Sequence, residues 1–177
     1  MIIKNFNYKC VNSTNDIAIN LIKQKKIKAG FVIAEKQKKG RGQRGKTWIS
    51  YKGNLFVSIF FSLEKINLNL KQLTKINVSL IMKLIAFYYK KNIKLKLPND
   101  ILINKKKVCG ILQEVIQKDG IKYLIVGIGL NLVKNPKLKD YPTTNLYELT
   151  KIKINTNNAL KKLILIYKNF LRSQKAF

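Results

Sequence analysis

Apolar residues recur along the chain with two different periods, and each period predicts one kind of element. A spacing of three and four residues places apolar side chains on one face of a helix, whereas continuous or alternating apolar runs are typical of strands. The chain contains both patterns. One predicted helix begins at Ser13 or Thr14, two others cover residues 70–89 and 157–171, and the predicted strands are 31–34, 54–63, 94–97, 101–103, 108–116 and 123–132.

Short polar segments separate these elements. Asp119-Gly120 is a hairpin signal, residues 104–107 make a tight turn, and residues 38–53 and 136–142 are predicted loops. Because hairpins join the strands more often than helices do, the pattern predicts an α+β fold. No repeat, linker or break in composition divides the sequence, so we expect a single domain.

The charge of the chain is strongly positive. Its 177 residues include 36 Lys and Arg but only 8 Asp and Glu, which gives a formal net charge of +28. A strongly basic chain suggests a nucleic-acid partner. However, 33 of the 36 cations are lysines scattered through nearly every segment, and Lys, Ile and Asn, all encoded by A/T-rich codons, dominate the composition. This scatter favours a drift in base composition over a selected binding face.

Two scarce residue types narrow the possible chemistry. The chain has no histidine, which excludes a Ser-His or Cys-His nucleophile pair, a His general base and a His-ligated metal. Cys10 and Cys109 are too few for a disulfide framework and indicate reduced thiols in a cytoplasmic protein. No uncharged run reaches the roughly 20 residues of a membrane helix, and the N-terminus lacks a signal-peptide core, so no membrane partner is expected.

Three residue types that are scarce in this chain, Arg, Gly and Trp, cluster in one segment. Two of the three arginines, three of the nine glycines and the only tryptophan lie within residues 40–48. Closely spaced glycines bring backbone N–H groups near a ligand, and the guanidinium groups of Arg41 and Arg44 match carboxylate or phosphate. The alternative is a flexible basic loop of the kind found in RNA-binding tails. A single copy between two apolar strands favours a binding loop.

Three further motifs carry candidate chemistry. Asn99 and Asp100 can hold Mg²⁺ against phosphate oxygens, although Pro-Asn-Asp alone is also an ordinary turn. Lys107, three residues before Gly110, can project its ammonium into a pocket, although a solvated surface is the alternative for any one of 33 lysines. The glycines of residues 127–131 lie within an apolar strand, which indicates close approach of a ligand or another backbone.

Together, these motifs resemble the catalytic domain of the biotin protein ligases in their order and spacing. The resemblance extends over residues 10–149. The matching segments are STN at 13–15, AEKQ at 34–37, GRGQRG at 40–45, Trp48, GNL at 53–55, KLPND at 96–100, KVCGIL at 107–112, GIGLN at 127–131 and TTNL at 143–146.

The resemblance implies a fold and a reaction. The fold is similar to the core of class II aminoacyl-tRNA synthetases, a mixed and mostly antiparallel sheet with helices on one side. In the implied reaction the biotin carboxylate attacks the α-phosphate of ATP, giving biotinyl-5′-AMP and pyrophosphate. A lysine of a biotin carboxyl carrier protein, such as that of acetyl-CoA carboxylase, then attacks the anhydride and releases AMP. ATP and Mg²⁺ are therefore expected, without a prosthetic group and without DNA.

Roles for individual residues are also implied by the resemblance. The catalytic set is Lys107, Arg41 and Asp100, with Asp100 as a Mg²⁺ ligand. The biotin-binding set is Ser13, Thr14, Asn15, Gln37, Gly40, Arg41, Gly42, Gln43, Lys107, Gly110 and Gly127. The nucleotide-binding set is Arg41, Arg44, Trp48, Asn99, Asp100 and Asn131.

The sequence departs from the family pattern in several places. Leu97 stands where the family usually has Trp, and Gln43 replaces a common Arg. Because the motifs begin at Ser13 and one helix follows them, residues 1–177 are expected to form the catalytic domain alone. Neither the N-terminal helix-turn-helix domain nor the C-terminal SH3-like barrel found in many members is expected.

Three alternatives remain open at this point. A lipoate–protein ligase shares the fold and the acyl-adenylate chemistry. Lipoate ligases resemble one another through a Gly-Gly-Gly loop and a His-Asp pair, whereas this chain has no His and an alternating Gly-Arg-Gly. A nucleic-acid-binding domain is supported by the charge alone. An inactive ligase is suggested by Leu97 and the missing barrel.

Overall fold

The computed structural model describes residues 3–25, 27–138 and 141–174. Its seven strands form one sheet in the order β1-β2-β3-β7-β6-β5-β4. Only β1 and β2 pair in parallel, and every other neighbouring pair in this sheet is antiparallel. The strands are β1 (Lys4–Val11), β2 (Ala29–Gln37), β3 (Leu55–Ser62), β4 (Ile93–Lys96), β5 (Asp100–Ile103), β6 (Lys106–Lys118) and β7 (Ile121–Leu130). The prediction of an α+β fold with a mixed, mostly antiparallel sheet is confirmed.

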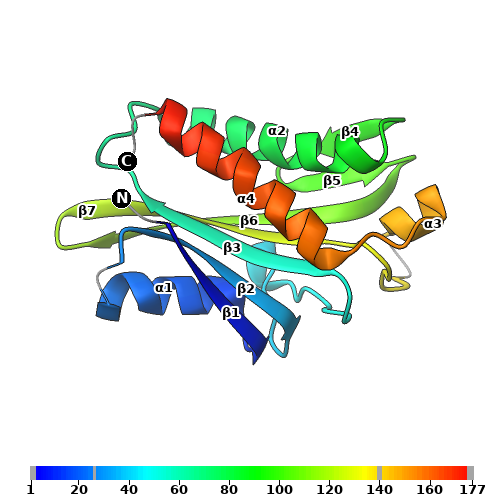
Figure 1. Cartoon of the computed structure of the whole chain (residues 1–177), viewed down its shortest axis with the longest axis horizontal. Helices are drawn as coiled ribbons and strands as arrows, with labels where there is room; N and C mark the ends of the chain where they lie inside the picture. The colour runs from blue at the N-terminus through cyan, green and yellow to red at the C-terminus, as the bar shows by residue number, and fades with distance from the viewer. Residues whose placement is uncertain (1–2, 26, 139–140, 175–177) are drawn as a thin grey trace.

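The helices cover both faces of the sheet. Helices α2 (Leu70–Tyr88) and α4 (Thr156–Ser173) lie on one face, and α1 (Thr14–Lys25) lies on the other (Figure 1). The expectation of helices on one side is therefore wrong for α1. The reason is the alternation along β3, where Ile59 packs with α2 and α4 while Phe60 packs with Ala18, Leu21 and Ile22 of α1.

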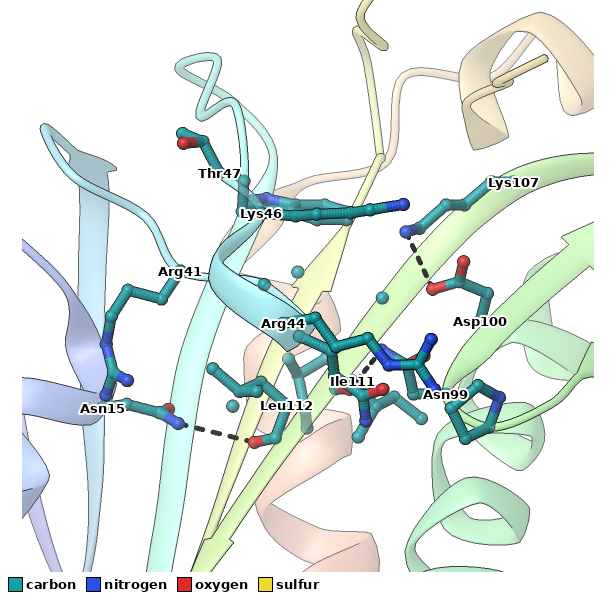
Figure 2. Close-up of a pocket in the computed structure, with 18 of the residues that line it drawn as sticks. Asn15, Arg41, Arg44, Lys46, Thr47, Asn99, Asp100, Lys107, Ile111 and Leu112 are labelled. Carbon is teal, nitrogen blue, oxygen red and sulfur yellow. Dashed lines mark hydrogen bonds and ion pairs between the residues drawn. The ribbon is translucent and has the colours of Figure 1, made fainter. Parts of the chain in front are cut away.

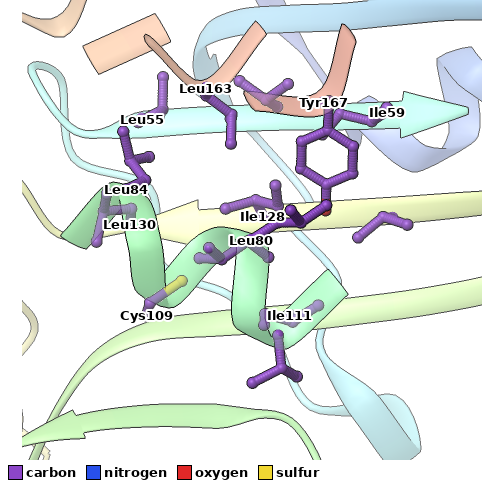
Figure 3. Close-up of a cluster of buried hydrophobic side chains, with 14 of the residues drawn as sticks. Leu55, Ile59, Leu80, Leu84, Cys109, Ile111, Ile128, Leu130, Leu163 and Tyr167 are labelled. Carbon is purple, nitrogen blue, oxygen red and sulfur yellow. The ribbon is translucent and has the colours of Figure 1, made fainter. Parts of the chain in front are cut away.

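The larger core lies between the sheet and the pair α2 and α4. Figure 3 shows side chains of both helices facing Leu55, Ile59 and Ile128 of the central strands. Cys109 is fully buried here, and burial raises the pKa of its thiol, so it stays protonated. Among the described residues, no helix is long and apolar enough to cross a membrane.

One buried polar chain crosses this apolar core. The hydroxyl of Tyr167 on α4 donates to Oδ1 of Asn77 on α2 at 3.1 Å. Nδ2 of Asn77 in turn donates to Oε1 of Gln113 on β6 at 2.9 Å. Since Tyr167 and Asn77 are completely buried, these hydrogen bonds satisfy groups that water cannot reach and fix both helices against the sheet.

Most predicted elements are confirmed within a few residues of their predicted ends. The helix predicted over 70–89 ends at Tyr88 and begins with a capping box between Asn69 and Gln72. Strand β1 (Lys4–Val11), at the edge of the sheet, was not predicted, although Phe6 and Tyr8 alternate with Asn and Lys as in a half-buried strand. The short helices α3 (Leu146–Thr150) and η1 (Gln43–Gly45) were also missed. Residues 139 and 140 of the predicted loop 136–142 lie outside the described residues.

Candidate functional site

A pocket of about 460 Å³ lies on the α1 face of the sheet. The start of α1, the loop of residues 40–48 and strands β5, β6 and β7 surround it (Figure 2). Every residue named in the predicted site lines this pocket except Gly40 and Asn131. The fold thus brings together segments that are about 115 residues apart in the chain, from Ser13 to Gly127.

Glycines make room for the pocket on the sheet surface. A Cβ added at Gly110 would lie 2.7 Å from the ring of Trp48, and one added at Gly129 would overlap the same indole. Gly110 and Gly129 are direct partners across β6 and β7, so the indole lies on a patch of bare backbone. At Gly127 a Cβ would overlap the side chain of Asn15. The need for small residues in this strand, predicted from the sequence, therefore has two separate causes.

The loop of residues 40–48 is a closed turn. The amide of Trp48 donates to the carbonyl of Gly40 at 2.8 Å, and the amide of Gly42 donates to the carbonyl of Lys46 at 2.6 Å. Arg44 and Gly45, at its tip, have φ of 53° and 73°, a left-handed region that Gly45 adopts without cost. A Cβ at Gly40 would lie 2.5 Å from the carbonyl oxygen of Trp48. Gly40 therefore shapes the loop from behind the pocket.

The α1 end of the pocket is a buried hydrogen-bond network. Oε1 of Gln37 accepts from the amide of Thr14 at 2.8 Å and from its hydroxyl at 3.1 Å. Ser58 on β3 contacts Oγ1 of Thr14 at 2.7 Å and Oδ1 of Asn15 at 2.5 Å. Ser13, Thr14 and Asn15 are at most 4% exposed. They form a fixed set of donors and acceptors that can bind a polar ring.

Arg41 is bound by two carboxylates at this same end. Its two terminal nitrogens donate to both oxygens of Glu114, at 2.9 and 2.7 Å. Nη2 also lies 2.9 Å from Oδ1 of Asp16 in the first turn of α1. The hydrogen bonds that Arg41 donates to Glu114 raise the pKa of Arg41 above its usual value, so the guanidinium stays charged. Figure 2 shows Arg41 on the side of Asn15, away from Lys107.

A second charged group forms the opposite end of the pocket. Nζ of Lys107 lies 2.7 Å from Oδ1 of Asp100, and the Tyr141 hydroxyl donates to Oδ2 of Asp100 at 2.8 Å. The ammonium also lies 5.3 Å from the ring centroid of Trp48 and 5.4 Å from that of Tyr141. Burial and the hydrogen bond to Asp100 raise the pKa of Tyr141, which keeps its hydroxyl a donor. A point charge is thus held facing the cavity.

Three neighbouring residues complete the rim of this end. Nδ2 of Asn99 donates to the carbonyl of Ile111 at 2.9 Å, which leaves its amide oxygen to face the pocket. Arg44 extends over the pocket from the loop (Figure 2). Leu97 is 79% exposed at the entrance. An apolar side chain is therefore presented to solvent at the entrance.

Asn131 has partners outside the pocket. Its Nδ2 donates to the carbonyl of Thr144 at 3.2 Å, and its Oδ1 accepts from Asn54 at 3.4 Å. Oδ1 of Asn54 in turn accepts from the amides of residues 132–134. In this structure Asn131 joins the end of β7 to the segments around it.

Sequence reasoning missed several residues of the site: Glu114, Tyr141, Ser58 and Asp16. A signal for the two acids was available. Arg and Gly were singled out because they are scarce, and the acids are equally scarce at eight in the chain. Three of those eight, Asp16, Asp100 and Glu114, contact Arg41 or Lys107. Tyr141 gave no such signal because it lies within the predicted loop 136–142, which has no regular periodicity.

The chain is similar in sequence to a known family of proteins. Residues 8–131 match the Biotin/lipoate A/B protein ligase family. The chain belongs to this family. A curated relative, the bifunctional ligase/repressor BirA of Bacillus subtilis, is 30% identical over 169 residues, which cover 92% of this chain and 52% of BirA. The chain spans about half the length of the curated relatives that it matches most fully.

Solved structures of biotin protein ligases share the fold. The Aquifex aeolicus enzyme in complex with biotin and ATP has a TM-score of 0.80 and 29% identity, covering 96% of this chain and 70% of that enzyme. The Leishmania major enzyme in complex with biotinyl-5-AMP has a TM-score of 0.81 and 25% identity, covering 94% and 74%. This chain therefore shares its fold with biotin protein ligases.

Proposed function

We propose that the protein attaches biotin to a lysine of a biotin carboxyl carrier protein through biotinyl-5′-AMP. The observation that carries this proposal is the position of Lys107, which Asp100 holds inside a pocket whose opposite end presents the uncharged side chains of Thr14, Asn15 and Gln37. Such a pocket suits a ligand with an uncharged polar ring at one end and an anionic group at the other. The complexes of the similar Aquifex aeolicus and Leishmania major enzymes, with biotin and ATP and with biotinyl-5-AMP, support the same assignment.

The first step needs charge stabilisation rather than an enzyme nucleophile. An oxygen of the biotin carboxylate forms a bond to the α-phosphorus of ATP, the bond from that phosphorus to the β-phosphate bridge breaks, and pyrophosphate leaves with the electron pair. Negative charge grows between carboxylate and phosphate. The ammonium of Lys107, held by Asp100 and flanked by Trp48, is positioned to stabilise it.

Binding residues divide between the two ends of the pocket. We assign the ring of biotin to Ser13, Thr14, Asn15 and Gln37. Thr14, Asn15 and Gln37 belong to the hydrogen-bond network at the start of α1, and Ser13 lines the pocket beside them. We assign the nucleotide to Trp48, Asn99, Asp100 and Arg44, which line the other end. Gly42, Gln43 and Arg41 belong to the loop that spans both ends, and Gly110 and Gly127 give the ligand access to the sheet.

The residues present are consistent with a magnesium ion shared with the phosphates of ATP. Mg²⁺ is commonly held by one or two carboxylates together with substrate phosphates. Asp100 is the one carboxylate that lines the pocket in the described part of the chain, and with one contact on each oxygen it keeps free lone pairs. When bound there, the ion supplies positive charge that screens the phosphates.

In the second step the amine of the acceptor lysine attacks the carbonyl carbon of biotinyl-5′-AMP, and AMP leaves. The family includes lipoate ligases as well as biotin ligases, so the acid must be tested directly. Lipoate ligases resemble one another through a His-Asp pair. We favour biotin because this chain has no His. A carrier protein as acceptor and a cytoplasmic location follow from the same proposal.

A transfer assay with two acids tests the proposal. The protein is incubated with ATP, Mg²⁺ and an isolated biotin-accepting domain, with either biotin or lipoate, and the acceptor is weighed by mass spectrometry. We expect one biotin per acceptor, and none on an acceptor whose target lysine is changed to arginine. Transfer of lipoate alone would assign the chain to the other branch. Salt-sensitive RNA binding without transfer of either acid would favour the nucleic-acid alternative.

A further inference from the structure

Glu114 joins two parts of the pocket that are far apart in the sequence. Its carboxylate accepts two hydrogen bonds from Arg41 of the loop and one from Nδ2 of Asn15, whose Nδ2–Oε2 distance is 2.6 Å. Asn15 lies at the start of α1, and Glu114 lies on β6. One carboxylate on a rigid strand therefore holds both the loop and the buried network.

We call the contacts of Glu114 with Arg41 and Asn15 the latch, because they constrain the side chains more than an isolated surface ion pair would. The side chain of Glu114 is 25% exposed, and its contact with Arg41 is bidentate. Bidentate pairs fix direction as well as distance. A second carboxylate, Asp16, contacts the same guanidinium from α1 at 2.9 Å. In a chain with only eight acids, two of them converge on one arginine.

The same carboxylate also constrains how Asn15 faces the ligand. Nδ2 of Asn15 is used by Glu114 and by the carbonyl of Leu112, at 3.4 Å. Its Oδ1 is therefore the atom that meets Ser58, at 2.5 Å. Without Glu114 the amide of Asn15 would lose its strongest acceptor, and the buried network at the start of α1 would lose its fixed polarity.

We propose that Glu114 is a positioning residue that holds Arg41 and Asn15 together and so orients the side chains that bind the ring of biotin. This inference rests on the proposed function. Glu114 is not one of the described residues that line the cavity. It therefore acts through Arg41 and Asn15, which do line it. Its loss should weaken binding of biotin more than binding of ATP at the Lys107 end.

Steady-state kinetics of Glu114→Gln test this, since the substitution keeps the size of the side chain and removes its charge. We expect the KM for biotin to rise about tenfold, the scale of one charge-assisted hydrogen bond, with a smaller rise in the KM for ATP. The matched control is Glu64→Gln, which removes an acid of a similar ion pair, with Lys28 at 2.9 Å, away from the pocket. An unchanged or lower KM for biotin in Glu114→Gln would overturn the latch.

A second readout does not depend on catalysis. An arginine-specific protease has only three sites in the sequence: Arg41 and Arg44 in the loop, and Arg172 near the end of α4. Glu114→Gln should speed cleavage at the two loop sites several-fold relative to Arg172, and Asp16→Asn should do so less. Equal rates in wild type and Glu114→Gln would overturn the proposal. If the wild type failed to make biotinyl-5′-AMP, the proposed function would fall, and this cleavage would still decide whether the latch exists.

Discussion

Nζ of Lys107 and Oδ1 of Asp100 lie 2.7 Å apart on neighbouring strands, with side chains only 20% and 16% exposed. At such low exposure each charge depends on the other, because removal of one partner leaves the other uncompensated. Tyr141 fixes the second oxygen of Asp100, and the indole of Trp48 borders the ammonium. The position of Lys107 is therefore set by three surrounding side chains before any substrate binds.

Replacement of Lys107 tests its part in the first chemical step. Lys107→Ala should slow biotin-dependent release of pyrophosphate by about 10²–10³-fold, the scale of losing one oriented donor to developing charge. The control is Lys106→Ala, because Lys106 is the exposed neighbour on the same strand. Near-normal release of pyrophosphate from Lys107→Ala would remove Lys107 from the mechanism.

The contact between Trp48 and the glycine pair predicts a fluorescence change. Gly129→Ala adds a Cβ that overlaps the indole, so the ring must move off the sheet. Because Trp48 is the only tryptophan, its emission should shift to longer wavelength, and the KM for ATP should rise several-fold. In a Trp48→Ala background the same glycine substitution should change the KM little further. Equal effects of Gly129→Ala in both backgrounds would show that the indole does not rest there.

Tyr141→Phe separates the hydroxyl of Tyr141 from its ring. The substitution removes the hydrogen bond to Asp100 and keeps the ring beside the ammonium groups of Lys96 and Lys107. Adenylate formation should fall by about tenfold or less, as expected for one hydrogen bond to a charged group. Tyr141→Ala should be more severe because the ring is lost as well. Full activity of Tyr141→Ala would contradict this account.

Tyr167→Phe tests the buried polar chain of the core. The change leaves Oδ1 of Asn77 without its donor in a fully buried site, which should lower the free energy of unfolding by about 1–3 kcal/mol. Urea denaturation of this variant and of Tyr147→Phe, at an exposed position, measures the difference. Adenylate formation should be preserved in Tyr167→Phe at temperatures below its unfolding transition. Equal stability of the two variants would contradict the role given to this hydrogen bond.

The net charge of +28 predicts a salt effect on the second step. Transfer to an acidic acceptor domain should slow between ionic strengths of about 0.01 M and about 0.15 M, where the screening length falls from about 30 Å to about 8 Å. Adenylate formation without acceptor serves as the control and should change less. A transfer rate that is indifferent to salt would show that the lysines do not steer the acceptor.

The sequence predicted the fold class, most elements and more than half of the residues that line the pocket, because the motifs are local and each ends at a strand or a turn. It did not predict that α1 covers the opposite face from α2 and α4. Ile59 and Phe60 of β3 are both apolar, yet they pack on opposite faces of the sheet. The position of α1 depends on which face each of these side chains occupies. A pattern without alternation cannot distinguish the two faces.

Partners brought together by tertiary structure were also beyond the sequence. Arg41 was predicted to bind substrate, yet nothing local indicates that Glu114, 73 residues later, binds its guanidinium. Asn131 was predicted at the nucleotide, and its side chain bonds to Asn54 and Thr144 outside the pocket. The roles of both residues toward ligands stay predictions.

The most direct test is a single-turnover measurement without acceptor. The protein, in excess over ATP labelled at the α-phosphate, is mixed with biotin and Mg²⁺, and the bound products are separated and weighed. The account predicts labelled biotinyl-5′-AMP in an amount that depends on biotin, and its disappearance with release of AMP when the acceptor domain is added. Hydrolysis of ATP without this intermediate, or no reaction with biotin at any concentration, would contradict it.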